Sequence, residues 1–527
     1  MNIPYAVLLD TVSIQKYIFQ SNKLKENIGA SFLVRQIYQE YLDDAVLKIF
    51  GNNFDTELWQ KEPSVVHIHS EPFEVGYIGG GNALLFFQEE EMAKKFVKQW
   101  TKSLLTNAPG ILTSVAMDKF DLDKFQESKI NLFNQLRYNK SKYVPETLIP
   151  RHGFTAECTH SGLSMDVYNA VKDEYVSASS NAKIDAAQQA LDYIQNKYKD
   201  ILKERFSFTN ELDKLGGINE EDSHIAIVHL DGNDMASRFK AMDSLEKIRN
   251  LSKSVKDATE IAFSDLLASI VNKSSEIMDS LGFDKSSSNE KYKYPRDNKG
   301  NFYLPIRPIV LGGDDITFVC DGKLGIYFAK LFIEAFEKQA VSDNKKLTAC
   351  AGVAIIKSKY PFYRGYQLAE ALCNNAKQKR RKNNDDYSYL DFHISMGGLA
   401  GSLEEIRNKY FNVYRGNLIY RPYKFISDDE YSFDRFVDRT VELKELFSGN
   451  KIYELRQMLT LSEESAREFV QEMNYRAMKL PEIPGRNYQE NLFDNKKTPY
   501  FDMIELIKFY PGFELNSKEA ANENISA

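Results

Sequence analysis

The sequence has few cysteines and no long hydrophobic run. Only four of its 527 residues are cysteine, namely Cys158, Cys320, Cys350 and Cys373, and they are widely separated. Two of them lie in apolar runs typical of strands, which indicates reduced, buried thiols rather than disulfides. No run of about 18 apolar residues is present, and the N-terminus lacks a basic region followed by an apolar core. We therefore expect a soluble, cytoplasmic protein without disulfides and without a membrane partner.

Positive charge is also scarce. Lys and Arg number 68 against 75 Asp and Glu, so the net charge is -7 and no global basic field indicates nucleic-acid binding. Local basic patches are still compatible with this charge. The length predicts three or four domains at roughly 150 residues each, so every domain can bury its own core.

A glycine-acid hairpin is the most informative stretch of the chain. Apolar runs within residues 308–320 flank Gly312, Gly313, Asp314 and Asp315. β-branched and aromatic residues on both sides predict two strands, and the glycines let the turn between them approach a ligand closely. Adjacent carboxylates repel one another unless a cation neutralises them, and their hard oxygens suit Mg²⁺ or Mn²⁺. A surface turn without a function is the alternative for this motif taken alone.

The order of predicted elements occurs twice, which indicates an internal duplication. The first copy runs through a strand (5–10), helices (23–50), two strand regions (65–69 and 75–87), a helix (89–107) and a strand (111–117); the second runs through 224–231, 244–281, 305–321, 323–341 and 347–356. Each copy predicts the order β-α-β-β-α-β, an antiparallel sheet with helices on one face. The expected fold class is α+β, with two ferredoxin-like palm domains of the kind found in polymerases and nucleotide cyclases.

Laying one copy over the other shows which acids the two copies share. Asp10 falls on Asp231, Gly79 and Gly80 fall on Gly312 and Gly313, and Gly81 and Asn82 fall on Asp314 and Asp315. The first copy keeps the glycines and lacks the paired carboxylates, which predicts a single active copy. In the second copy an antiparallel sheet brings Asp231 to the same edge as Asp314 and Asp315. Three carboxylates suit two divalent ions, and two ions suit an in-line displacement at phosphorus, so nucleotidyl transfer is the natural reaction.

A basic helix follows the last core strand of the second copy. Residues 363–382 are predicted to be helical and end in Lys377-Gln-Lys-Arg-Arg-Lys382, whose first cation could reach triphosphate oxygens. A solvated helix end is the alternative, because basic residues favour that end of the helix dipole.

Together these motifs resemble the large polymerase-cyclase subunit of type III CRISPR effector complexes. The resemblance rests on Leu230-Asp-Gly-Asn-Asp-Met235, Leu311-Gly-Gly-Asp-Asp315, Ala351-Gly-Val-Ala354, Ala376-Lys377, Ile14-Gln15, Gly29-Ala30-Ser31 and Gly79-Gly-Gly-Asn82. It spans nearly the whole chain in order. It implies two palm domains, the second with Gly-Gly-Asp-Asp, and synthesis of cyclic oligoadenylates from ATP when the complex binds target RNA. The implied partners are ATP, smaller effector subunits, and guide and target RNA.

The resemblance also implies roles for single residues. Asp231, Asp314 and Asp315 would be the catalytic acids and would bind two Mg²⁺ or Mn²⁺ ions. The residues expected to bind nucleotide are Gly232, Asn233, Asp234, Gly312, Gly313 and Lys377 in the second palm, and Gly79, Gly80, Gly81 and Asn82 in the first.

The chain departs from the family pattern in three places. The acid expected two residues after Asp231 is replaced by Asn233, with an acid displaced to Asp234. No His-Asp dipeptide is present, so we expect no HD nuclease activity. Residues 151–163 offer only His152, Cys158 and His160 in place of a cysteine-rich site, so we expect no zinc.

The expected organisation is a degenerate first palm (1–150), a mainly helical linking domain (151–221), the second palm (222–398) and an α-helical C-terminal domain (399–527). A mobile loop at 285–301 and a disordered tail from Asn516 are expected from their composition. Two rival functions are a catalytically silent nucleotide-binding scaffold of the same complex and a stand-alone cyclic dinucleotide synthase.

Overall fold

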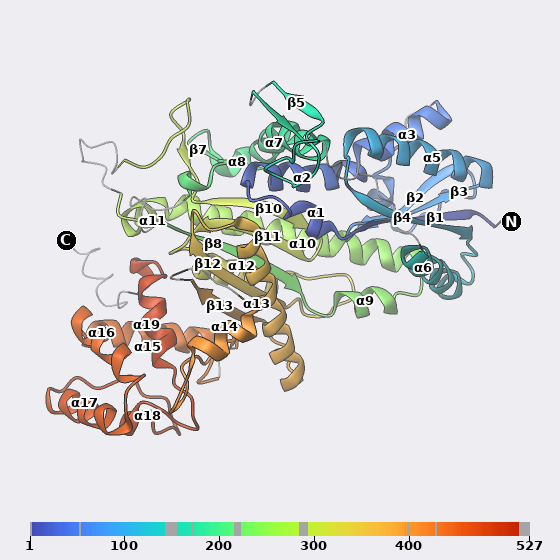
Figure 1. The fold of residues 1–527 in the computed structure, drawn as a ribbon. Coiled ribbons are helices and arrows are strands. Elements are labelled where there is room, and N and C mark those ends of the chain that lie inside the picture. Colours follow the sequence, from blue (N-terminus) through green and yellow to red (C-terminus); the bar gives the residue numbers. More distant parts are fainter. Residues whose placement is uncertain are drawn as a thin grey trace.

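The computed structural model describes residues 3–51, 54–142, 155–170, 173–215, 223–283, 293–395, 397, 401–426 and 429–515. It has the expected α+β fold, with one sheet in each palm and a lobe of helices toward the C-terminus (Figure 1). The predictions for His152, for residues 285–292 of the 285–301 loop and for the C-terminal tail from residue 516 concern residues outside these ranges.

The first palm is built on a four-stranded antiparallel sheet. Its strands are β1 (Tyr5–Val12), β2 (Phe73–Gly79), β3 (Asn82–Phe87) and β4 (Leu112–Lys119), in the order β2-β3-β1-β4. Its helices are α1 (Ile14–Ile18), α2 (Leu24–Ile37), α3 (Glu40–Phe50), α4 (Leu58–Lys61), α5 (Glu90–Asn107) and α6 (Phe125–Lys142). The consecutive apolar residues of β1 and β3 are buried in one core with α2, α3 and α5.

The second palm repeats this arrangement in a six-stranded sheet. Its strands are β8 (His224–Gly232), β10 (Ile306–Gly312), β11 (Asp315–Asp321), β12 (Ala349–Lys357), β13 (Tyr389–Ile394) and β16 (Tyr423–Lys424), in the order β10-β11-β8-β12-β13-β16. Its helices are α9 (Met235–Ala241), α10 (Leu245–Asn272), α11 (Ser274–Ser280), α12 (Gly325–Glu337) and α13 (Phe362–Asn383).

The duplication is visible in the pairing register. Asp10 lies opposite Asn82 in the first sheet, and Asp231 lies opposite Asp315 in the second. Both hairpins also carry a register irregularity at the equivalent place, between Val75 and Tyr77 and between Pro308 and Val310. The overlay of the two copies made from the sequence is therefore confirmed.

Three features differ from the expectation. Residues 65–69 do not form a strand, because side chains take their backbone groups: Arg249 donates to the carbonyl of Val65, and the amide of Ile68 donates to Glu74. Strand β13 extends the second sheet in parallel to β12. Helices do not cover only one face of this sheet, since α10 and α12 pack against one side, whereas α13 packs with Ile225 and Ile227 on the other.

The segment between the two palms contains β5 (Val167–Asn169), β6 (Glu174–Val176), the long helix α7 (Ala178–Lys197), α8 (Lys199–Leu202) and β7 (Phe206–Ser207). Strand β7 pairs in parallel with β9 (Phe302–Tyr303), which precedes β10. Helix α7 crosses α2 closely, because a Cβ at Gly29 would lie 1.8 Å from the carbonyl oxygen of Lys183.

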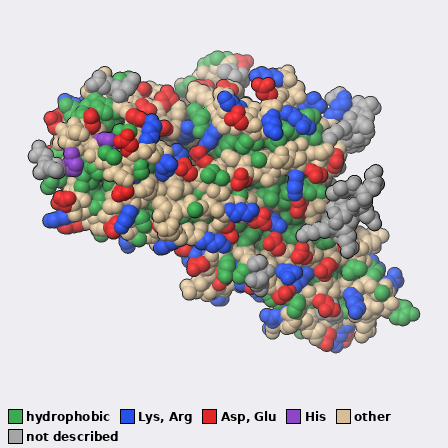
Figure 2. Space-filling view, turned by 180° about the vertical axis from the view of Figure 1, so that it is seen from behind, with side chains coloured by type: hydrophobic (Ala, Val, Ile, Leu, Met, Phe, Trp, Pro, Cys, Tyr) green, Lys and Arg blue, Asp and Glu red, His purple; other side chains and the backbone are tan. Residues whose placement is uncertain are grey.

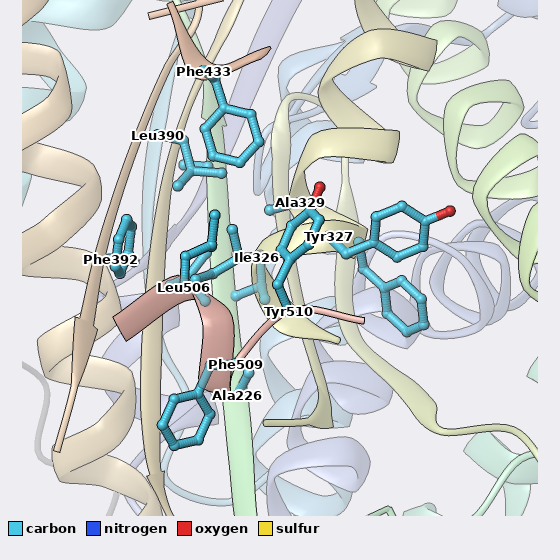
Figure 3. Close-up of a cluster of buried hydrophobic side chains, with 14 of the residues drawn as sticks. Ala226, Ile326, Tyr327, Ala329, Leu390, Phe392, Phe433, Leu506, Phe509 and Tyr510 are labelled. Atoms are coloured by element: carbon cyan, nitrogen blue, oxygen red, sulfur yellow. The ribbon is translucent and has the colours of Figure 1, made fainter. Parts of the chain in front are cut away.

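The C-terminal lobe packs onto the second palm. It contains α14 (Leu403–Tyr410), β14 (Asn412–Val413), β15 (Gly416–Asn417), α15 (Phe433–Leu446), α16 (Gly449–Met458), α17 (Glu463–Tyr475), α18 (Tyr488–Asn491) and α19 (Tyr500–Lys508). Leu506 of α19 and the following Phe509 lie beside Ala226 of β8 and Ile326 of α12 in one buried cluster (Figure 3). The lobe and the second palm therefore share a hydrophobic core. The division of the chain into four domains stays a prediction, and the second sheet itself continues past residue 398 through β16.

Charged side chains of both signs are interspersed over the face shown in Figure 2. None of the described helices is both long enough and apolar enough to span a membrane.

Candidate active site

The hairpin between β10 and β11 places the paired acids at the end of the second sheet. Gly312 pairs with Asp315 across the turn, and Gly313 adopts a φ of +63°, which glycine tolerates far better than other residues. Asp314 occupies the second turn position, and Asp315 begins β11. The glycines therefore serve the tight turn that the sequence predicts.

Asp231 approaches this hairpin from the neighbouring strand. It lies opposite Asp315 on β11 and opposite Cys350 on β12. The amide of Gly232 donates to the carbonyl of Asp314 at 3.0 Å, and a Cβ at Gly232 would lie only 2.8 Å from Cβ of Asp314. Glycine at position 232 thus permits the close approach of the strand end to the acidic turn.

The acids lie close together at a partly exposed end of the sheet. Burial and the charge of Asp231 raise the pKa of Asp314 to about 6. Burial, together with Asp231 and Asp314, raises the pKa of Asp315 well above its usual range. Although 31% of the Asp315 side chain is exposed, its Oδ1 atom is buried and has no hydrogen-bond partner.

Lys377 is the cation that faces these acids. Its Nζ lies 2.5 Å from Oδ2 of Asp231, and the side chain is mostly buried. Although burial opposes a charge here, Asp231 raises the pKa of Lys377 above its usual value. The helix end predicted from the sequence is therefore not simply solvated at this position, because α13 directs Lys377 to the acidic strand end.

The acids have the chemistry of a divalent-cation site, although they do not form a ready cluster. Within the described ranges, no group of three or more His, Cys, Asp or Glu side chains is arranged to hold one metal ion. Asp231 is instead paired with Lys377, and Asp315 accepts from Gln15. The unpartnered oxygen of Asp315 and the mutual repulsion of the acids fit a hard divalent ion, which would neutralise both.

The turn after β8 makes mainly internal contacts. The amide of Asn233 donates to the carbonyl of Thr348 at 2.8 Å, and its side-chain Nδ2 donates to the Thr348 hydroxyl at 3.0 Å. Asp234 is paired with Arg380 at 2.5 Å. Because the amides of Gly232 and Asn233 already have acceptors, a contribution of these residues to nucleotide binding must come from other atoms.

The first palm keeps a reduced version of the site. Lys140 lies 2.5 Å from Asp10, as Lys377 lies 2.5 Å from Asp231. Gly80 and Gly81 have φ values of +58° and +75°, which suit the tight turn of a two-residue hairpin. Oδ1 of Asn82 is buried without a hydrogen-bond partner. The four residues predicted to bind nucleotide thus lie at one strand end.

The glycine hairpins of the two palms meet. A Cβ at Gly313 would have the amide nitrogen of Gly80 as its nearest neighbour, at 4.0 Å. Helix α10 binds both turns on one of its faces: Ser252 donates to the carbonyl of Ile78 at 3.3 Å, and Thr259 donates to that of Gly313 at 2.5 Å. The two candidate nucleotide sites therefore face each other across a short gap.

The sequence reasoning did not identify several residues around these acids. His229 lies behind Asp315, donates to or accepts from Thr317 at 3.0 Å, and has a pKa lowered to about 4 by burial. Lys140 is the one that an alignment of the two copies could have found, since α6 follows β4 as α13 follows β12. Gln15 belongs to the quoted Ile14-Gln15 motif, but nothing local indicates its partner.

Cys158 and His160, which lie where many family members have a cysteine-rich site, have other partners. Cys158 is buried, with Sγ 3.9 Å from the hydroxyl of Ser180, and His160 is paired through Nδ1 with Glu26. His160 therefore connects the region before α7 to helix α2.

One family of known proteins matches the second palm of this chain. Residues 224–385 match the family model described as Cas10/Cmr2, second palm domain. No curated protein matches the chain.

Several solved structures are similar over most of the chain. A Csm1-Csm4 cassette in complex with pppApApA is 14% identical with a TM-score of 0.49, and covers 96% of this chain and 69% of that one. Csm1 in T. onnurineus is 16% identical with a TM-score of 0.46, and covers 98% and 70%. A Csm1-Csm4 cassette in complex with AMPPNP is 13% identical with a TM-score of 0.44, and covers 96% and 70%. At these identities and TM-scores the likeness carries no argument about chemistry.

The resemblance drawn from the motifs agrees with this match, in which residues 224–385 are similar to the second palm domain of Cas10/Cmr2.

Proposed function

We propose that this chain is a metal-dependent nucleotidyltransferase that makes cyclic oligoadenylates from ATP as the large subunit of an RNA-guided type III CRISPR complex. The observation that carries the proposal is the strand pairing of Asp231 with Asp315 beside Asp314 and Lys377, in a domain that matches the Cas10/Cmr2 second palm. Smaller effector subunits and guide and target RNA are the proposed partners.

The proposed reaction joins two ATP molecules. The 3′ oxygen of the acceptor attacks the α-phosphorus of the donor, the bond from that phosphorus to the bridging oxygen breaks, and pyrophosphate leaves. Repetition lengthens the chain. Attack of the last 3′ oxygen on the α-phosphorus of the first nucleotide then closes the ring and releases a further pyrophosphate, and in every step the proton of the attacking hydroxyl goes to solvent. Two Mg²⁺ or Mn²⁺ ions, when bound, would activate the hydroxyl and neutralise the triphosphate.

The chain's own residues would orient the two partners. Asp231, Asp314 and Asp315 would supply carboxylate oxygens at the donor side. Lys377 is paired with Asp231, and it would become free to bind the triphosphate when a divalent ion neutralises Asp231 in its place. The facing hairpin, Gly79 to Asn82, would present the acceptor. Much of the rate of such a reaction comes from holding both partners in line, which the contact between the two hairpins favours.

The two rival functions make different predictions. A silent scaffold requires no paired acids, whereas Asp231 and Asp315 lie opposite each other here with a buried, unpartnered oxygen. A stand-alone cyclic dinucleotide synthase would require no partners and would yield only dinucleotides.

The test is to incubate the purified protein with labelled ATP and Mn²⁺, with and without candidate subunits and target RNA. We expect cyclic oligoadenylates from the wild type and none from a variant carrying Asp314→Ala and Asp315→Ala. The variant should fold, because removing mutual repulsion at the end of a sheet costs little stability. Undiminished ATP turnover by this variant would contradict the catalytic assignment.

A second arm addresses the acceptor side. Gly80→Asn adds a side chain to the hairpin of the first palm, where its Cβ would lie 3.7 Å from Nδ2 of Asn82, and asparagine tolerates the left-handed backbone of this position. We expect loss of ATP joining with ATP binding at the second palm preserved. Full activity in this variant would separate the first palm from the reaction.

A further inference from the structure

The first palm sends one side chain into the acidic site of the second. Gln15 of α1 donates from Nε2 to Oδ2 of Asp315, across 300 residues of sequence. Two buried oxygens of this pair, Oδ1 of Asp315 and Oε1 of Gln15, have no hydrogen-bond partner. The bond thus fixes one oxygen of the carboxylate, and the other stays buried without a hydrogen-bond partner.

No other side chain close to Asp315 is placed to do the same among the described residues. His229 Nδ1 lies 3.5 Å from Oδ1, but it is shared with the hydroxyl of Thr317 at 3.0 Å. Lys377 is engaged by Asp231. A neutral amide donor also suits this position, because it orients a carboxylate without cancelling the charge that attracts a cation.

Helix α1 is held firmly on three sides. The ring of Phe19, directly after α1, stacks on that of Tyr366 in α13, with centroids 3.6 Å apart. Lys183 of α7 donates to the carbonyl of Tyr17 at 2.9 Å. Ile14 fills the space beside Gly81, where a Cβ would lie 2.2 Å from its Cδ1. Gln15 is therefore a fixed donor and not a surface side chain that happens to reach the site.

We propose that Gln15 is a positioning residue of the second palm's cation site, which holds one oxygen of Asp315 so that the other is presented to a divalent cation. The inference rests on the proposed function of that site. It makes the first palm a structural part of the metal site, in addition to any role in presenting the acceptor nucleotide.

The test measures Mn²⁺ binding to the full chain without nucleotide, from the electron paramagnetic resonance signal of the free ion. Gln15→Leu and Gln15→Met remove the amide donor and put an apolar side chain of similar length in its place. We expect their Mn²⁺ dissociation constants to rise about 10- to 100-fold, as for other residues that orient a metal ligand. Phe19→Leu, which removes the stacking on Tyr366, should weaken binding in the same direction if the Gln15 variants do not fold.

Gln36→Leu is the matched control. Gln36 lies in the same palm, and its amide binds Glu40 on an exposed face of α2. This variant should bind Mn²⁺ as the wild type does. Asp315→Asn should abolish the same binding phase, which assigns the phase to this site.

Any of three results would overturn the inference. The three test variants could bind Mn²⁺ with wild-type affinity, Gln36→Leu could lose as much affinity as they do, or Asp315→Asn could leave the binding unchanged. The outcomes also separate it from the proposed function. A wild type that makes no oligoadenylate but loses Mn²⁺ affinity on Gln15→Leu supports the inference alone. A productive wild type whose affinity is unchanged by Gln15→Leu supports the function alone.

Discussion

The three acids of the second palm differ in the side chains that compensate their negative charge. Asp231 has a lysine, Asp315 has an amide donor, and no ion pair or side-chain hydrogen bond is found for Asp314 within the described ranges. Because each carboxylate has a different partner, the three acids are not equivalent. Burial first, and then the negative charge of the neighbouring acids, raises the pKa of Asp314 to about 6 and that of Asp315 well above its usual range.

Lys377 provides a direct test of this balance. Lys377→Met should lower kcat/KM for ATP about 10- to 100-fold, because a hydrogen bond to a charged group contributes about 1.5 to 3 kcal/mol. Steady-state kinetics at saturating Mn²⁺ checks this. Lys382→Met, which removes an exposed lysine near the end of the same helix, is the control. Equal kinetics for both variants would assign Lys377 to the fold alone.

Among the elements, helix α10 joins the two palms most directly. Its Arg249 is fully buried and reaches into the first palm, where it binds Glu74 at 2.6 Å and the carbonyls of Val65, Val75 and Gly76. The same helix binds both glycine hairpins through Ser252 and Thr259. One helix therefore sets how the two candidate nucleotide sites face each other.

Arg249→Met should destabilise the protein by about 3 to 5 kcal/mol, because it leaves Glu74 buried without its cation. The loss appears as a lower midpoint of thermal unfolding. Adding Glu74→Gln should recover part of it, since the amide oxygen can still accept from Ile68. Lys253→Met, which breaks an exposed pair with Asp257 in the same helix, should cost less than about 1 kcal/mol. A midpoint for Arg249→Met equal to that of Lys253→Met would contradict this account.

The chain as a unit is stabilised by cores that cross its parts. One buried cluster joins the first palm to Ile225, Ile227 and Tyr366 of the second, and another joins the second palm to the C-terminal helices. His393 of β13 lies at the second junction, where its ring packs edge-on against Phe411. Burial, Arg421 and Arg407 lower the pKa of His393 to about 3.

The lowered pKa of His393 predicts that the folded protein loses stability in acid. Between pH 6.5 and 3 the unfolded chain binds a proton at this position that the folded chain does not, so stability falls as the pH falls through this window. The loss is about 1.4 kcal/mol at one unit below the unfolded pKa. His393→Gln should therefore reduce the difference between unfolding midpoints at pH 7.5 and 5.5. The exposed His69→Gln should leave it unchanged, and the same result in both variants would refute the assignment.

Local sequence was enough to predict the elements that carry the chemistry. Glycines followed by acids between two apolar runs define a hairpin from a few neighbouring residues, and the repeated element order defines two palms, because turn geometry and strand alternation are short-range properties. The same pattern predicted that Asp231 and Asp315 lie at one edge of the sheet, and the structure places them opposite each other. The strand expected at 65–69 was wrong, since distant side chains, those of Arg249 and Glu74, take its backbone hydrogen bonds.

The contacts between the palms followed only from the fold in three dimensions. Gln15 reaches Asp315, Arg249 reaches Glu74 and Phe19 stacks on Tyr366 over separations of 300, 175 and 347 residues. No periodicity links such pairs, because their meeting depends on how two separately patterned sheets pack and not on the neighbours of either residue. The sequence therefore identified the acids of the site, whereas the packing of one palm on the other determined what holds them.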